Sequence, residues 1–147
     1  MEIDIEAAAG RVASACRALP AVAAAYLFGS ALGRCRPRSD IDVAIIRVPQ
    51  DGQDDLEGLR AGLALEADLL DRLPPLSGHP FDVTVLEAGQ PLFAMRVLRQ
   101  GRLCFVRDTE AHTDFLEDVA QRHRENGPRQ RQAIREVLEE EIGRHGH

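Results

Sequence analysis

Two aspartates separated by one residue are the side chains of this sequence best placed to do chemistry. Asp40 and Asp42 open the stretch DIDVAII, which has the apolar composition of a buried strand. Alternate residues of a strand point to the same side, so both carboxylates are expected on one face. Two neighbouring carboxylates repel each other unless a cation joins them, and hard oxygen ligands suit Mg²⁺ shared with substrate phosphates. The spacing therefore predicts a divalent metal site.

A Gly-Ser turn precedes the aspartates. Gly29 and Ser30 follow the continuous apolar run over residues 21–28, which predicts a strand covered on both faces. Glycine allows a tight turn and a close approach of the backbone to a ligand. Ser30 is a good helix N-cap, and the free N–H groups at a helix N-terminus favour phosphate. We interpret the turn as a phosphate cradle facing a two-carboxylate metal site, an arrangement suited to nucleotidyl transfer.

A third carboxylate, Asp82, lies in the alternating stretch FDVTVL. A carboxylate with apolar neighbours on both sides is costly to bury unless it is paired or bound to metal. An aspartate at a frayed strand start, or one in an ion pair, is the other explanation. We expect Asp82 to join Asp40 and Asp42 in the site.

The segment between the turn and the aspartates is basic. It holds Arg34, Arg36 and Arg38. One interpretation is a solvated loop, and the other is that these guanidinium groups neutralise triphosphate charge. Arg38 and Ser39, next to Asp40, are the residues of this segment that we include among the candidates for nucleotide binding.

The elements expected to position these residues alternate between helix and strand. Apolar periodicity and the Pro and Gly positions predict a helix over about 5–19, strands over 21–28 and 40–48, a helix over 56–70, a strand over 81–86, a helix over 91–100 and a strand over 103–106. The expected fold class is α/β (α+β), with a small mixed sheet and flanking helices. We expect residues 1–107 to form the core and 108–147 a C-terminal helical extension of the same domain.

Two sets of apolar residues at helical spacing lie outside the strands. We expect the first to be the apolar stripe of the long helix: Leu56, Leu59, Leu63, Ala67 and Leu70. The second follows the C-terminal helices: Phe115, Val119, Ile134, Leu138 and Ile142. Because the second set exceeds what a small sheet needs for cover, we expect part of it to be a protein interface, with a partner or a second copy.

Bulk composition excludes several classes of protein. A chain of 147 residues fits one domain, and a net charge of −6 with a pI near 5.3 leaves no footprint for general nucleic-acid binding. No apolar run approaches the ~20 residues of a membrane span. The acidic N-terminus lacks a signal-peptide pattern. Three scattered cysteines argue against a disulfide framework and for a reducing cytoplasm.

Gly29-Ser30, nine intervening residues and Asp40-Ile41-Asp42 resemble the signature of the DNA polymerase β-type nucleotidyltransferase superfamily. The resemblance is greatest to its minimal MNT-type members, which are antitoxins of HEPN ribonuclease toxins, and it covers roughly residues 3–106. It implies the nucleotidyltransferase fold. It also implies that Asp40, Asp42 and Asp82 bind one or two Mg²⁺ ions and carry the catalysis, while Gly29 and Ser30 hold the phosphates of ATP.

The resemblance further implies transfer of AMP from ATP to a hydroxyl, with a tyrosine of a cognate HEPN toxin as the acceptor. A second hypothesis is a non-catalytic antitoxin that neutralises its toxin by contact. In favour of this second hypothesis, Ala31 stands where these proteins usually carry an arginine, and nine residues rather than the commoner ten precede Asp40. A third is nucleotidyl transfer to a small molecule such as an aminoglycoside.

Overall fold

The computed structural model describes residues 4–29 and 40–125 of the chain. The predicted residues Ser30, Arg38 and Ser39 lie outside these ranges, as do the apolar positions of the last C-terminal helix. The described elements follow the expected alternation: α1 (Ile5–Arg17), β1 (Val22–Phe28), β2 (Ile41–Arg47), α2 (Asp55–Asp71), β3 (Phe81–Val85), α3 (Pro91–Gln100), β4 (Arg102–Val106) and α4 (Thr109–Glu125).

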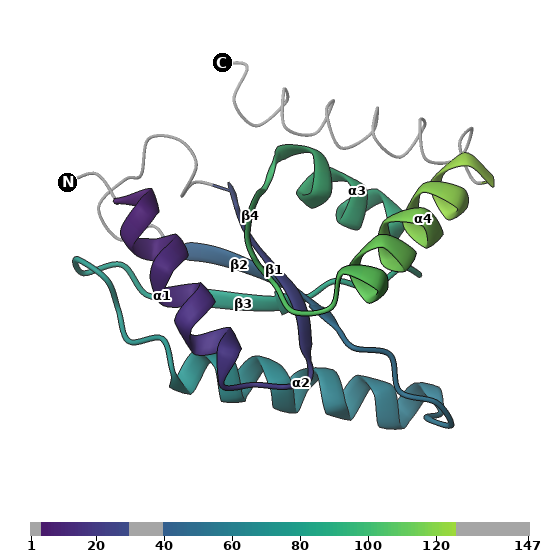
Figure 1. Ribbon diagram of the computed structural model, residues 1–147, viewed down its shortest axis with the longest axis horizontal. Coiled ribbons are helices and arrows are strands. Elements are labelled where there is room, and N and C mark those ends of the chain that lie inside the picture. The colour runs from purple at the N-terminus through teal and green to yellow at the C-terminus, as the bar shows by residue number, and fades with distance from the viewer. Residues whose placement is uncertain (1–3, 30–39, 126–147) are drawn as a thin grey trace, which may run out of the picture.

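The strands form one mixed sheet in the order β3-β2-β1-β4 (Figure 1). β1 runs antiparallel to both of its neighbours, whereas β2 and β3 are parallel. This confirms the predicted mixed sheet with flanking helices. The apolar run of β1 is buried along nearly its whole length because helices cover both faces of this inner strand.

The two faces of the sheet have separate cores. Helices α1 and α2 cover one face, where Val12 and Leu69 pack on Leu27 and Ile45. Helices α3 and α4 cover the other face, and there Val97 packs in a cluster that includes the alternate β1 residue Tyr26, Ile46 of β2 and Ala111 of α4. Figure 1 shows this three-layer arrangement, with α2 and α4 on opposite sides of the strands.

Helix α2 buries a different face from the one expected. Its buried residues are Gly62, Leu65 and Leu69. The expected stripe points away from the sheet: Leu56, Leu59, Leu63 and Leu70 are 54%, 57%, 56% and 45% exposed. The helix has two apolar stripes, and the one containing Gly62 packs closer, since a Cβ at that position would lie 3.8 Å from the Val85 side chain. The prediction that Leu56–Leu70 forms the core face is therefore wrong.

Helix α4 uses its apolar residues within the fold. Val119 is fully buried, and Phe115 packs against the cluster beneath α3. Val119 is therefore covered by the protein itself, whereas Phe115 is only partly buried. Among the described residues, no helix is long and apolar enough to cross a membrane.

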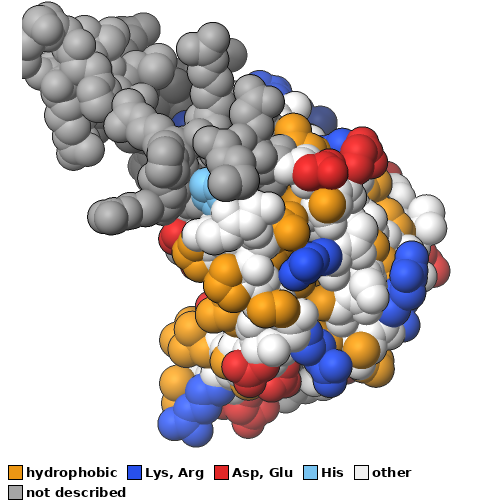
Figure 2. All heavy atoms as spheres, turned by 90° about the vertical axis from the view of Figure 1, so that its left-hand side faces the viewer, with side chains coloured by type: hydrophobic (Ala, Val, Ile, Leu, Met, Phe, Trp, Pro, Cys, Tyr) orange, Lys and Arg blue, Asp and Glu red, His pale blue; other side chains and the backbone are white. Residues whose placement is uncertain are grey.

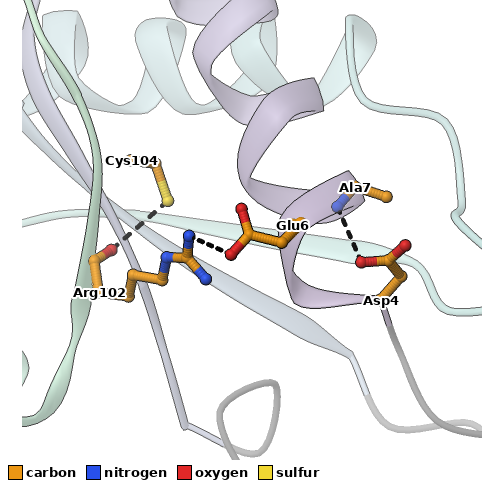
Figure 3. A network of polar contacts seen from close by, with 5 residues as sticks. All are labelled: Asp4, Glu6, Ala7, Arg102 and Cys104. Atoms are coloured by element: carbon orange, nitrogen blue, oxygen red, sulfur yellow. Dashed lines mark hydrogen bonds and ion pairs between the residues drawn. The ribbon is translucent and has the colours of Figure 1, made fainter.

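The edge strand β4 is tied to α1 by two arginines. Figure 3 shows Glu6 of α1 reaching Arg102 of β4, with 2.6 Å between Oε1 and Nη2. Arg107, just beyond β4, donates Nη2 hydrogen bonds to the carbonyl oxygens of Cys16 and Arg17, at 2.9 and 2.8 Å. These carbonyls lie at the C-terminus of α1, where orphan acceptors and the negative end of the dipole favour a cation.

Candidate active site

The sheet register brings two of the predicted aspartates side by side. Asp42 is the second residue of β2, and its Cα partner on the parallel strand β3 is Asp82. Paired residues of neighbouring strands point to the same face and lie on backbones ~4.8 Å apart. Asp40 immediately precedes β2. The structure therefore places the three predicted carboxylates at one end of the β2–β3 pair.

Gly29 lies directly against Asp42. On the antiparallel side, Asp42 pairs with Phe28, the last residue of β1, so the turn that follows β1 begins beside this carboxylate. Gly29 has a φ of +71°, and a Cβ built on it would lie only 2.4 Å from Oδ2 of Asp42. The left-handed conformation favours glycine here, and any larger residue would also displace the Asp42 carboxylate. The turn that was expected to face the aspartates therefore begins beside Asp42.

A tight turn aligns the start of β3 with the start of β2. Ser77 and Gly78 have φ values of +53° and +82°, and Leu76 and His79 exchange two backbone hydrogen bonds of 2.9 Å across them. Two central residues with positive φ are the mark of a type I′ hairpin turn. The chain then continues into Pro80, whose carbonyl accepts a 2.8 Å hydrogen bond from the Ile41 amide. This bond sets the register that pairs the two aspartates.

The electrostatics at Asp42 are unfavourable to its ionised form. Burial raises the pKa of the Asp42 carboxyl above its ordinary value, and repulsion from Asp82 and then Asp40 raises it further. Asp42 is half-buried, whereas Asp40 and Asp82 are exposed. The expectation that Asp82 is buried among apolar neighbours is therefore wrong: the β3 side chains alternate, and those of Phe81 and Val83 enter the core instead.

These residues fit a hard divalent cation by their chemistry. The three carboxylates offer oxygen ligands, and their mutual repulsion is what a bound cation removes. Within residues 4–29 and 40–125, however, no three His, Cys, Asp or Glu side chains already converge as a metal site. A divalent cation could bind here only if side chains rotated, and Asp82 is exposed to solvent, where rotation is less restricted.

A groove of about 530 Å³ lies at the opposite end of β2 and β3, away from the carboxylates. Arg47, Leu59, Leu86 and Phe115 are among its lining residues, which also include the N-terminus of α2. Sequence reasoning did not identify this groove, because its walls come from the ends of elements that are far apart along the chain. It is not part of the aspartate site.

Comparison with known proteins places the chain among nucleotidyltransferases. Residues 11–110 match the family described as Polymerase beta, Nucleotidyltransferase. The matched segment includes Gly29 and the aspartates at positions 40, 42 and 82. No curated protein sequence matches the chain.

Solved structures with the same fold come from toxin–antitoxin complexes. One, a toxin–antitoxin solved with AMP-PNP, is 19% identical with a TM-score of 0.55, and the match covers 88% of this chain and 98% of that chain. An MntA–HepT complex is 18% identical with a TM-score of 0.54, covering 90% and 98%. A third, a tri-AMPylated Shewanella oneidensis HEPN toxin with its MNT antitoxin, is 17% identical with a TM-score of 0.51, covering 91% and 98%.

At these identities the solved structures establish a shared fold, and the family rests on the sequence match. That match spans more than half of the 147 residues and contains the glycine turn and all three aspartates. The chain belongs to the polymerase β nucleotidyltransferase family.

Proposed function

We propose that this protein transfers AMP from ATP to a hydroxyl group of a HEPN-type toxin, as a Mg²⁺-dependent antitoxin of the cytoplasm. The observation that carries the proposal is the pairing of Asp42 with Asp82 beneath the Gly29 turn. A carboxylate cluster next to a turn without side chains has room for a phosphate and a negative surface that calls for a metal ion.

The proposed reaction is an in-line displacement at the α-phosphorus of ATP. The acceptor oxygen forms a bond to phosphorus, the bond to the bridging oxygen breaks, and pyrophosphate leaves with the electron pair. Asp40, Asp42 and Asp82 would hold Mg²⁺, which would lower the pKa of the attacking hydroxyl and stabilise charge on the leaving group. Asp82, the exposed member of the pair, takes the proton of the hydroxyl. The Gly29 turn lets the β- and γ-phosphates approach the backbone, with Ser30, Arg38 and Ser39 as further candidates for nucleotide contact.

The choice of acceptor is supported by the solved structures of the same fold. One of them contains an AMPylated HEPN toxin bound to its MNT antitoxin, and another was solved with AMP-PNP. For the present chain we propose the same class of partner, with a tyrosine hydroxyl as the acceptor. The exposed position of Asp82 is consistent with an acceptor supplied by another protein, since a macromolecular hydroxyl can reach only a carboxylate at the surface.

The test is transfer of label from α-labelled ATP to the candidate toxin in the presence of Mg²⁺. Asp42→Asn keeps the size of the side chain and removes its charge, and it is expected to lower transfer by several orders of magnitude. Asp68→Asn on the exposed surface of α2 is the matched control and should transfer normally. Equal transfer by Asp42→Asn and the native protein would contradict the proposed site.

A second candidate function is neutralisation of a toxin by contact alone. Two observations favour it: Ala31 replaces the usual arginine, and the described carboxylates do not already converge on a metal site. A toxin-activity assay with Asp42→Asn separates the two functions. If Asp42→Asn no longer neutralises the toxin, the result supports the enzyme. If Asp42→Asn neutralises the toxin fully, and neither it nor the native protein transfers label, the result supports neutralisation by contact.

A further inference from the structure

The outer face of helix α2 carries an unpartnered row of apolar side chains. We call it the leucine stripe and define it by the following exposed residues: Leu56, Leu59, Leu63, Ala67 and Leu70. Each of its leucines is about half exposed, although the same helix already buries another face against β3. In the space-filling view of Figure 2, hydrophobic side chains reach the surface beside charged ones at the lower end, the end at which α2 lies in Figure 1. Solvent exposure of four leucines along one helix marks an interaction surface.

The spacing of the leucine stripe is symmetric about its centre. Counted from Leu63, the other members lie four and seven positions away in both directions. When two such helices pack antiparallel about a two-fold axis at Leu63, each Leu56 faces the Leu70 of the other copy. Leu59 likewise faces the smaller Ala67, so a large side chain meets a small one. A pattern that reads the same from both ends suits an isologous contact between two copies.

The charges beside the stripe fit the same arrangement. At 100° per residue, Arg60 and Asp71 flank the same side of the stripe, eleven positions apart. The two-fold axis places the same flank of both helices together, so Arg60 of one copy comes within a side-chain length of Asp71 of the other. Neither residue has a partner among the described residues. On the opposite flank, Glu66 is already engaged, because its Oε1 accepts a 2.9 Å hydrogen bond from the Val85 amide.

The size of the surface is at the lower end of specific protein–protein contacts. Half-exposed leucines on two copies remove on the order of 800 Å² of apolar surface from water, and the flanking charged side chains bring the contact towards the ~1,200 Å² at which specific interfaces begin. Area alone does not set affinity, but contacts of this size are typical of weak, reversible association. We infer that the leucine stripe is the contact surface of a homodimer, with two α2 helices packed antiparallel about Leu63.

The test measures the mass of the full-length protein by sedimentation equilibrium over a series of micromolar concentrations. The native protein should approach the dimer mass. Leu63→Arg places two unpaired guanidinium groups at the two-fold axis and should raise the dissociation constant at least about 100-fold. Leu63 is 56% exposed, so its replacement should leave the circular dichroism spectrum and the melting temperature unchanged. The matched control is Leu103→Arg, the same change at a 44% exposed leucine of β4.

A charge exchange tests the orientation of the two helices. Arg60→Asp brings like charges together and should weaken the dimer about 10-fold, and the double variant Arg60→Asp/Asp71→Arg should restore it. A native protein that stays monomeric throughout the series overturns the inference. So does a dimer that Leu63→Arg does not weaken, and so does a monomer that binds a different protein through this stripe. If the double variant does not restore dimerisation, the antiparallel packing of the two helices is contradicted.

Discussion

Replacement of Gly29 by alanine should have two effects. It should disturb the contact between the turn and Asp42, and it should add the backbone cost of a left-handed residue. The added Cβ would lie 2.4 Å from Oδ2 of Asp42, whereas ordinary contacts of this kind begin near 3.4 Å. Either the carboxylate or the turn must therefore move by about 1 Å, and a displacement of that size at a catalytic group can lower the rate ~100-fold. The φ of +71° adds a backbone penalty of about 1–2 kcal/mol for any residue with a Cβ.

Gly52→Ala is the control that isolates these two effects. Gly52 has a φ of +81°, yet a Cβ on it meets no atom within 4 Å. Both variants should therefore lose about 1–2 kcal/mol of unfolding free energy, measured by urea denaturation. Only Gly29→Ala should lose nucleotide transfer and the increase in melting temperature produced by Mg²⁺ with ATP. A Gly29→Ala variant with native transfer, or a Gly52→Ala variant that loses it equally, would refute the reasoning.

Three further variants test the electrostatics and the packing. Burial and carboxylate repulsion raise the pKa of Asp42, so the folded state keeps this proton longer than the unfolded chain and stability falls as the pH rises above 3.8. Asp42→Asn should accordingly be more stable than the native protein at pH 7, and the gain should vanish in urea titrations below pH 3.8. The Nε2 atom of His112 lies 2.5 Å from the Tyr26 hydroxyl, and burial lowers the pKa of His112. The free energy of unfolding should therefore be highest above pH 6.5 and should decline below it, where the unfolded chain takes up the proton first. The urea concentration at the midpoint of unfolding should therefore change more between pH 7.5 and pH 5.5 for the native protein than for His112→Gln. Arg107→Ala removes the donor for three carbonyl oxygens and should cost about 2 kcal/mol of unfolding free energy, whereas Arg99→Ala, on the exposed end of α3, should cost less than about 0.5.

Local patterns predicted most of the elements because their signals lie within a few residues. The apolar run that ends at Phe28 and the helix between Pro91 and Gly101 are examples, and each is observed within one or two residues of its expected ends. The pairing of strands is different, since it joins residues that are far apart along the chain. Nothing in the spacing of the β2 and β3 residues shows that Asp42 and Asp82 share a register position.

The two aspartate predictions show where sequence reasoning reaches its limit. Asp40 and Asp42 were grouped by strand periodicity, a local property, and the structure keeps them together at the start of β2. Asp82 was added on the premise that it is buried, which is wrong, and on the family resemblance, which led to the same strand pair. Helix α2 illustrates the same limit: its two apolar stripes have equally good periodicity, and only packing against β3 selects the one that contains Gly62.

The raised pKa of Asp42 connects the stability of the fold with its proposed chemistry. A half-buried carboxylate that faces two others lowers the stability of the folded protein at neutral pH, and packing alone gives no reason to place it there. The turn at Gly29 adds to this cost, because it brings a left-handed backbone against the same carboxylate and leaves no room for a side chain. In the proposed function both costs would be offset by binding, since a cation would relieve the repulsion and the bare backbone would accommodate a phosphate. Mg²⁺ with ATP should therefore stabilise the native protein more than either Asp42→Asn or Gly29→Ala, because each variant lacks one half of this arrangement.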